Sequence, residues 1–381
     1  MNLNNHIKPV ILLLLVLMNH SAFAQKQTNF KWWNPAKSNV YTIEGQAWPK
    51  EVAAPYDRLP ARAEKTISPE VWKLSKQSAG LVVRFKTNAS SITVRYQVDG
   101  ALALPHMPAT GVSGVDLYGV DNSGNYLWCA GKYAFKDTIE YKFTDLEPQK
   151  KDAKNSIGYR LYLPLYNSVK WLEIGVPDSN LIETFAPGKV KPVVVYGTSI
   201  AQGACASRPG MCWTSILSRK LALPLINLGF SGTGRLEKEV LNLVNEVDAS
   251  VYVLDCLPNL IGGKNMFTQS EIYDRLVNAV KQIRVKHPNT PIILTDHFGY
   301  TDGLINPVKR AAYLAVNQTN HRAFKDLQTL GIKNLNLLPM ENLQQDMDTS
   351  VDGIHPTDLG MMRYAEAYQQ LLSKILPKKH R

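Results

Sequence analysis

Long hydrophobic runs are scarce in this chain of 381 residues. The longest candidate, Val10–Met18, is much shorter than the roughly 20 apolar residues that span a bilayer. It is followed by Ser21-Ala22-Phe23-Ala24, which has the small-x-small pattern of a cleavage site. We therefore predict a signal peptide over residues 1–24 and an exported protein, periplasmic or secreted, without stable membrane insertion. An uncleaved anchor is the alternative.

Cysteine is also rare, and its four copies form no Cys-x-x-Cys pair. The histidines lack metal-ligand spacing, so we predict no metal site. The chemistry considered below requires no cofactor, and none is expected. Cys205 and Cys212 are close enough in sequence to staple one loop with a disulfide, which an exported chain permits. The alternative, which the sequence leaves open, is that all the cysteines are small buried hydrophobes.

Acidic residues are fewer than basic ones, which gives a formal net charge of +11. The basic residues are scattered, and the only tight cluster is Lys378-Lys379-His380-Arg381. No RNA- or DNA-binding module is present, so nucleic acid is not an expected partner. A preference for anionic polymers or surfaces remains open. The sequence does not indicate the oligomeric state.

Long amphipathic helices are absent from residues 25–186, which contain short strand-like segments separated by turns. Leu81–Lys86 and Ile92–Tyr96 show partial alternation of apolar and polar residues. Further strand-like segments are Gly114–Val120, Tyr126–Ala130, Tyr159–Leu165 and Val169–Val176. Such a series predicts an all-β sandwich or jelly-roll domain.

From residue 187 to 381 the pattern changes to alternating strands and helices, after a Pro- and Gly-containing linker. The expected strands are Val193–Tyr196, Leu225–Leu228, Val251–Asp255, Ile292–Thr295 and Asn334–Leu338. The expected helices are Cys212–Leu221, Leu236–Val244, Glu271–His287, Lys309–Leu330 and Leu359–Leu376. This alternation predicts an α/β domain with a mainly parallel sheet covered on both faces. All strand carboxyl ends then lie along one edge, where sites of such sheets form.

The first of these strands ends at Gly197-Thr198-Ser199, which presents a serine hydroxyl at that edge. We predict that Ser199 is a nucleophile, which requires a base to take its proton. His355 follows the last strand and supplies an imidazole. Asp352, three residues earlier, can hold that imidazole in the tautomer whose Nε2 faces the serine.

Donors for an oxyanion are predicted from three of the same strand ends. The first is the backbone N–H of Ser199 at its strand-to-helix turn. The second is Gly232, in a glycine-rich loop whose backbone can approach a ligand closely. The third is the side-chain amide of Asn259. Arg208, in the loop after Ser199, is either a contact for an anionic acyl group or a surface arginine.

Taken together, these segments resemble the SGNH (GDSL-like) hydrolase family over about residues 190–378. Gly197-Thr198-Ser199-Ile200, with Gly203, resembles its nucleophile block, and Gly232, Asn259 and Asp352-x-x-His355 match the other three. The resemblance implies a flavodoxin-like three-layer fold, a Ser199–His355–Asp352 triad, and oxyanion donors at Ser199, Gly232 and Asn259. The chain departs from the family in reading GTSI for GDSL and Leu-Pro-Asn-Leu for Gly-x-Asn-Asp.

A second resemblance concerns Gly114-Val115-Asp116-Leu117-Tyr118, which is similar to the GxDLY motif of a β-rich domain that precedes SGNH domains in secreted bacterial proteins. Two-domain carbohydrate esterases have a similar layout. The expected function is therefore an exported serine esterase that removes small acyl groups, acetyl foremost, from carbohydrate. The alternatives are an esterase or thioesterase for lipid or other acylated small molecules, and a glycan-binding protein with a degenerate hydrolase domain.

Overall fold

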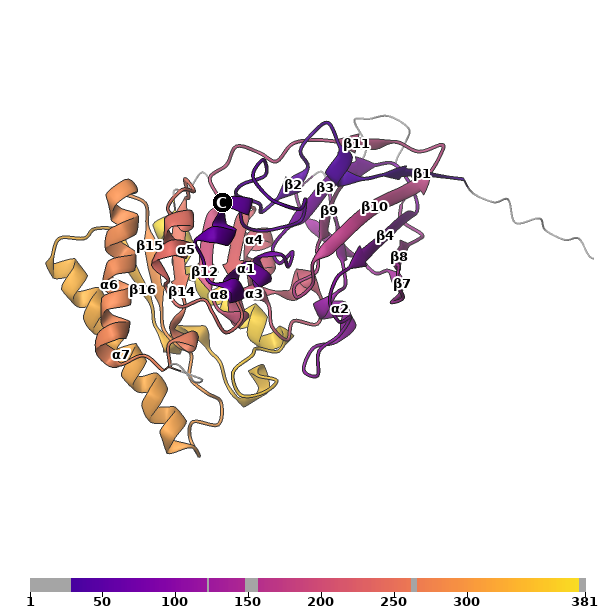
Figure 1. Ribbon diagram of the computed structural model, residues 1–381. Coiled ribbons are helices and arrows are strands. Elements are labelled where there is room, and N and C mark those ends of the chain that lie inside the picture. The colour runs from indigo at the N-terminus through magenta and orange to yellow at the C-terminus, as the bar shows by residue number, and fades with distance from the viewer. Residues whose placement is uncertain (1–28, 122, 148–156, 262–265, 377–381) are drawn as a thin grey trace, which may run out of the picture.

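The computed structural model describes residues 29–121, 123–147, 157–261 and 266–376. The predicted signal peptide and the basic cluster at the C-terminus lie outside these ranges. A β-rich region is followed along the chain by an α/β region, and the two lie side by side (Figure 1). Within the described ranges, no helix has the length and apolar character needed to cross a membrane.

The β-rich region consists of two antiparallel sheets packed face to face. One sheet has the strand order β1-β10-β4-β8-β7, and the other has β11-β3-β9-β5-β6 with β2 paired to β3. These strands are β1 Phe30–Trp33, β2 Ile43–Glu44, β3 Val82–Thr87, β4 Ile92–Val98, β5 Asp116–Val120, β6 Tyr126–Cys129, β7 Lys132–Ala134, β8 Ile139–Phe143, β9 Ile157–Tyr162, β10 Val169–Pro177 and β11 Ile182–Thr184. One buried cluster combines side chains of both sheets, so the predicted sandwich is confirmed.

Strand β3 shows how the alternating pattern forms this sandwich. Val83 and Phe85 are fully buried in the core between the sheets. Arg84 and Lys86 alternate with them and therefore lie on the outer face. Two short helices, α1 Pro69–Ser75 and α2 Ala109–Val112, were not predicted from the sequence.

The α/β region has a parallel sheet with the order β13-β12-β14-β15-β16, which is the flavodoxin-like order 2-1-3-4-5. Its strands are β12 Val193–Gly197, β13 Leu225–Gly229, β14 Val251–Asp255, β15 Ile292–Thr295 and β16 Leu335–Leu338. Its helices are α3 Ser199–Gln202, α4 Trp213–Leu221, α5 Lys238–Val244, α6 Gln269–Lys286, α7 Pro307–Thr329 and α8 Asp358–Ile375. The predicted fold class is confirmed.

Helices cover both faces of this sheet and give it three layers. Helices α5, α6 and α7 pack on one face, and α4 and α8 pack on the other (Figure 1). The central strands β12 and β14 are buried on both faces, which explains their nearly continuous apolar sequence. The direction of the strand order reverses beside β12, so the edge beyond Gly197 is the expected location of a site.

A segment from the start of the chain contributes to the same α/β core. Trp48, Leu59 and Val71 belong to the buried cluster that lies beneath α5, α6 and α7. Arg58 is almost fully buried and donates to the carbonyls of Asn227 at 3.2 Å and Gly229 at 2.7 Å. The β-rich and α/β regions are therefore joined by buried contacts as well as by the linker.

The cysteines form no disulfide, since all four are free. The Cys205–Cys212 staple, one of the two alternatives that the sequence left open, is therefore not present. Both of these side chains are buried, as is Cys256, whereas Cys129 is half-buried. The alternative of small buried hydrophobes describes three of the four.

Candidate active site

Ser199 lies at a tight turn that connects β12 to α3. Thr198 caps the helix, with its Oγ1 accepting from the N–H of Ile200 at 3.3 Å. The turn requires a glycine at its start, because a Cβ on Gly197 would lie 2.7 Å from the Cβ of Ala201 and 3.0 Å from the carbonyl oxygen of Asp255. Gly203 ends the short helix at a φ of 109°, which favours glycine. The GxSxxxG spacing therefore follows from the geometry of this turn.

His355 meets Ser199 across the edge of the sheet. Its Nε2 lies 2.9 Å from Ser199 Oγ, and its Nδ1 lies 2.7 Å from Oδ2 of Asp352. The other carboxylate oxygen accepts from the backbone N–H of His355 at 2.9 Å. Because Nδ1 donates to the carboxylate, Nε2 carries the lone pair that can accept the serine proton. The structure thus brings together the three residues predicted as a triad.

The carboxylate of Asp352 is suited to remain charged. Partial burial opposes ionisation, but the hydrogen bonds from the side chain and backbone of His355 outweigh it and lower the pKa of Asp352. A negative carboxylate stabilises the imidazolium that forms when the histidine takes a proton. Ser199 itself is only 7% exposed, so its side chain lies in a largely desolvated position.

The loops after β13 and β14 flank this pair, because Gly197 is in register with both Gly229 and Asp255. Gly232 has a φ of 70°, and among the described residues its N–H has no hydrogen-bond partner. That donor is consequently available to a ligand. A Cβ on Gly234 would lie only 1.9 Å from the carbonyl oxygen of Gly197, so this loop packs directly on the end of β12.

Asn259 lies in the short 3₁₀ turn Leu257–Asn259, and its side-chain amide contacts the glycine loop. With its oxygen turned toward the loop, it accepts from the N–H groups of Thr233 and Gly234, both at 3.2 Å. In this orientation the NH₂ group of Asn259 points away from the N–H groups of Thr233 and Gly234. Asn259 therefore holds the shape of the loop that carries Gly232, a contact that the sequence did not predict.

The β-sandwich adds residues to the site that sequence reasoning missed. The ring of His106 stacks on the ring of His355, with centroids 5.9 Å apart. The hydroxyl of Tyr166 donates to the carbonyl of Ser199 at 3.3 Å. His106 lies in an irregular loop, where no periodic pattern marks a functional side chain.

The GxDLY motif explains how the sandwich is attached. Asp116 accepts from Arg208 and, at 3.0 Å, from the N–H of Gly210, while Tyr118 Oη lies 2.7 Å from Arg208 Nη1. Arg208 is thus engaged by the motif rather than being a free surface or substrate-facing arginine. Burial raises the pKa of Asp116, and Arg208 opposes that rise. Ser207, just before, donates from its N–H to Asp358 Oδ1 at 2.9 Å, at the start of α8.

Possible metal ligands gather at one place within the described residues. Cys205, Asp352 and His355 each offer a ligand atom, and these atoms lie within 4.8 Å of one another. Two of the three belong to the histidine–carboxylate pair described above. The cluster is therefore part of the same site.

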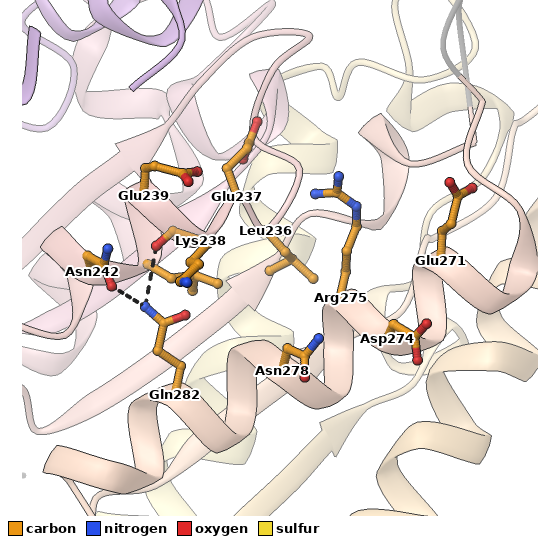
Figure 2. A pocket seen from close by; sticks show the side chains of 11 residues that line it. Leu236, Glu237, Lys238, Glu239, Asn242, Glu271, Asp274, Arg275, Asn278 and Gln282 are labelled. Carbon is orange, nitrogen blue, oxygen red and sulfur yellow. Dashed lines mark hydrogen bonds between the residues drawn. The ribbon is translucent and has the colours of Figure 1, made fainter. Parts of the chain in front are cut away.

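A large cavity of about 780 Å³ lies elsewhere, between α5 and α6. Figure 2 shows its mixed lining, in which Arg275 and Glu271 project from α6 and Glu237 lies at the start of α5, and Gln282 donates to Asn242. None of the predicted site residues lines this cavity. We therefore assign the candidate site to Ser199 from the hydrogen bonds among Ser199, His355 and Asp352, although the large cavity lies elsewhere.

Comparison with known families and structures agrees with this geometry. Residues 190–373 match the model of the GDSL-like lipase/acylhydrolase family, and residues 30–182 match the GxDLY model, described as the N-terminus of SGNH-hydrolase-type esterases. The crystal structure of a candidate GDSL-like lipase from Bacteroides ovatus is 33% identical, has a TM-score of 0.81, and covers 91% of this chain and 98% of its own. The chain belongs to the GDSL-like lipase/acylhydrolase family.

This GDSL-like hydrolase also shares its fold with more distant structures. The salicylyl-acyltransferase SsfX3 of a tetracycline biosynthetic pathway is 18% identical, with a TM-score of 0.74 and coverage of 92% of this chain and 99% of its own. An acetyl xylan esterase from the rumen bacterium Butyrivibrio proteoclasticus is 9% identical, with a TM-score of 0.51 and coverage of 91% and 99%. Among curated proteins, no sequence matches the chain.

Proposed function

We propose that this GDSL-like hydrolase is an exported serine esterase that removes small acyl groups, acetyl foremost, from carbohydrate. The observation that carries the proposal is the continuous chain of contacts from Ser199 Oγ to His355 Nε2, at 2.9 Å, and from His355 Nδ1 to Asp352, at 2.7 Å. Export is proposed from the N-terminal sequence pattern alone.

In the proposed reaction, Ser199 Oγ attacks the ester carbonyl while its proton passes to His355 Nε2. The carbonyl oxygen becomes an oxyanion, for which the N–H groups of Ser199 and Gly232 and the amide of Asn259 are the proposed donors. Collapse of this intermediate breaks the bond to the sugar oxygen, which receives the proton from His355. Water then attacks the acyl-serine by the same route, which releases the carboxylic acid and restores the serine.

The choice of substrate rests on two supports. One distant structural neighbour is an acetyl xylan esterase and another is an acyltransferase, so this fold is compatible with small-acyl chemistry. In addition, the β-sandwich brings the exposed His106 against His355, which gives the site a polar wall on the side of the sandwich. A polar wall suits a sugar alcohol better than a long acyl chain.

The test measures release of acetate from acetylated xylan alongside hydrolysis of short- and long-chain esters and of an acyl thioester. We expect acetyl esters to be preferred, and Ser199→Ala to lose a factor on the order of a thousand or more in kcat. Ser123→Ala, in an exposed turn, is the matched control and should keep full activity.

Other outcomes separate the alternatives. Preference for long-chain esters or thioesters would replace carbohydrate as the substrate class. The other alternative is a glycan-binding protein with an inactive hydrolase domain. It would be supported if the wild type and Ser199→Ala had equal rates and if a serine-directed phosphonate did not label Ser199.

A further inference from the structure

The outer face of the sandwich sheet that contains β3, β9 and β5 carries a hollow of about 240 Å³ that shares no residue with the site around Ser199. The hollow forms over Gly158, which is paired with Lys86 on one side and Val120 on the other and has no side chain to fill the space between them. Its lining consists of Arg84, Lys86, Val120, Asp121, Gly158, Tyr159, Arg160 and Phe185.

The positive charges of this hollow are only partly neutralised. Arg84 and Arg160 share one carboxylate, that of Glu44, at 3.3 and 2.6 Å. Lys86 has no ion-pair partner among the residues the structure describes. The carboxylate of Asp121 accepts from the backbone N–H groups of its own turn, at 2.9 and 2.8 Å, and so is held by that turn. Asp121 nevertheless remains charged, because hydrogen bonds from Asn125 and the turn lower its pKa, and Glu183 is in register with Lys86. Lys86 is therefore the cation of this lining that forms no ion pair with the described residues.

Arg84 also has an unused donor, since its Nε is buried and lacks a hydrogen-bond partner. Burial lowers the pKa of Arg84, and the neighbouring Arg160 lowers it further, while Glu44 opposes both. A bound anion would offset the repulsion between the two guanidinium groups.

Aromatic rings hold the cations in place. The guanidinium of Arg84 lies 4.7 Å from the ring centroid of Phe185, and the ammonium of Lys86 lies 5.8 Å from the same centroid. On the other side, Arg160 lies 5.3 Å from the ring of Tyr126. These contacts fix the cations at the wall of the hollow, and Phe185 gives an apolar surface beside them.

We propose that this hollow binds one hexuronate residue of an acidic glycan. The sugar carboxylate would contact Lys86 at the wall of the hollow, and the sugar ring would lie against Phe185. The hollow is slightly smaller than the range of about 300–1,000 Å³ usual for whole small-molecule sites, so it suits a single ring of a longer chain. The net charge of +11 favours approach of such a polyanion.

The test is calorimetric titration of full-length Ser199→Ala protein with trigalacturonate, with galactotriose and inorganic phosphate as comparisons. We expect trigalacturonate to bind, more weakly as salt increases, and galactotriose and phosphate to bind at least tenfold more weakly. In the same background, Lys86→Gln and Phe185→Ala should each weaken trigalacturonate binding about tenfold. Lys132→Gln, on an exposed strand of the other sheet, is the matched control and should have no effect.

No binding of trigalacturonate, or equal binding by the Lys86→Gln and Lys132→Gln proteins, would overturn the proposal. Equal affinity for phosphate would show a general anion site, and equal affinity for galactotriose would remove the role of the carboxylate. Circular dichroism checks that each variant is folded. Because the readout is binding by a protein that lacks the serine hydroxyl, the result is independent of whether the proposed esterase activity is found.

Discussion

Asp116 of the β-sandwich is bonded to Arg208 in the loop that follows Ser199. The carboxylate is almost completely buried, and the arginine is about three-quarters buried. A charge pair in this position is costly to break, because the remaining partner is left in a poorly hydrated environment. The GxDLY motif is thus a docking contact between the two regions of the chain.

We expect Asp116→Asn to destabilise the protein by about 2–4 kcal/mol, since it leaves the Arg208 charge unpaired. Urea denaturation measures this change. Asp248→Asn is the control, because it removes an exposed ion pair with Lys191 and should change stability by less than about 1 kcal/mol. Equal effects of the two substitutions would mean that the docking contact contributes little.

Asp352→Asn should lower kcat by a factor of about a thousand to ten thousand with little loss of stability. The amide cannot hold His355 in the tautomer that accepts the serine proton, and it cannot stabilise the imidazolium. Steady-state kinetics on a soluble acetyl ester measures the change. Asp348→Asn, in the same loop, is the matched control; a comparable loss there would point to loop disruption instead.

Gly232→Ala should lower kcat by a factor of about ten to a thousand. No atom lies within 4 Å of the added Cβ, but the φ of 70° disfavours alanine and should shift the N–H that we propose as an oxyanion donor. Gly331→Ala is a close control, since it has a φ of 83° and equally open surroundings but lies beyond α7. Both variants should lose about 1–2 kcal/mol of stability, and only Gly232→Ala should lose activity.

His106→Ala should raise KM for acetylated xylan several-fold and leave the rate with a small activated ester nearly unchanged. The ring stacks on His355 from the sandwich side, so it is placed to contact the alcohol part of a large substrate. Steady-state kinetics of the wild type and the variant with both substrates measures these changes. An equal loss with both would mean that the stack supports His355 and does not contact the sugar.

Asp255 should make stability depend on pH. Its complete burial raises the pKa to about 7, although Tyr364 and Tyr368 donate to the carboxylate and lower it. Between about pH 4 and 7 the folded protein therefore holds a proton that the unfolded chain has released. This group's stabilising contribution is full below about pH 4 and is lost as the pH rises toward 7.

Asp255→Asn resembles the protonated, uncharged carboxylic acid. The variant should therefore not lose stability through this position as the pH rises from about 4 to 7. The stability of the variant relative to the wild type should rise with pH over this window, by up to about 4 kcal/mol. Urea denaturation at several pH values measures the difference. A difference that does not vary with pH would show that Asp255 is charged, or neutral, throughout the window in the folded state.

Much of the α/β region could be predicted because its signals are local. Each strand is an apolar run and each helix has an apolar face, so the elements and their order follow from short windows of sequence. Ser199, Asp352 and His355 could be predicted because each follows a strand, and parallel strands bring their ends to one edge.

The contacts that were missed join residues far apart in sequence. The Asp116–Arg208 pair and the His106–His355 stack depend on how the sandwich sits against the α/β region, which no local pattern encodes. The contact between the Asn259 amide and Gly234 was also missed, because it depends on the shape of a neighbouring loop; its role as an oxyanion donor stays a prediction. The choice between a disulfide and free thiols for Cys205 and Cys212 also required their three-dimensional geometry.

The placement of Arg58 has a consequence for the order in which the molecule can be completed. Arg58 is synthesised long before β13, which contains the carbonyl groups of Asn227 and Gly229 that it binds. These partners have therefore not been synthesised when Arg58 leaves the ribosome. The segment that carries Trp48, Leu59 and Val71 must wait for most of the α/β region before it can cover that core. We expect separate expression of residues 187–381 to yield a protein with an uncovered apolar surface, prone to aggregation.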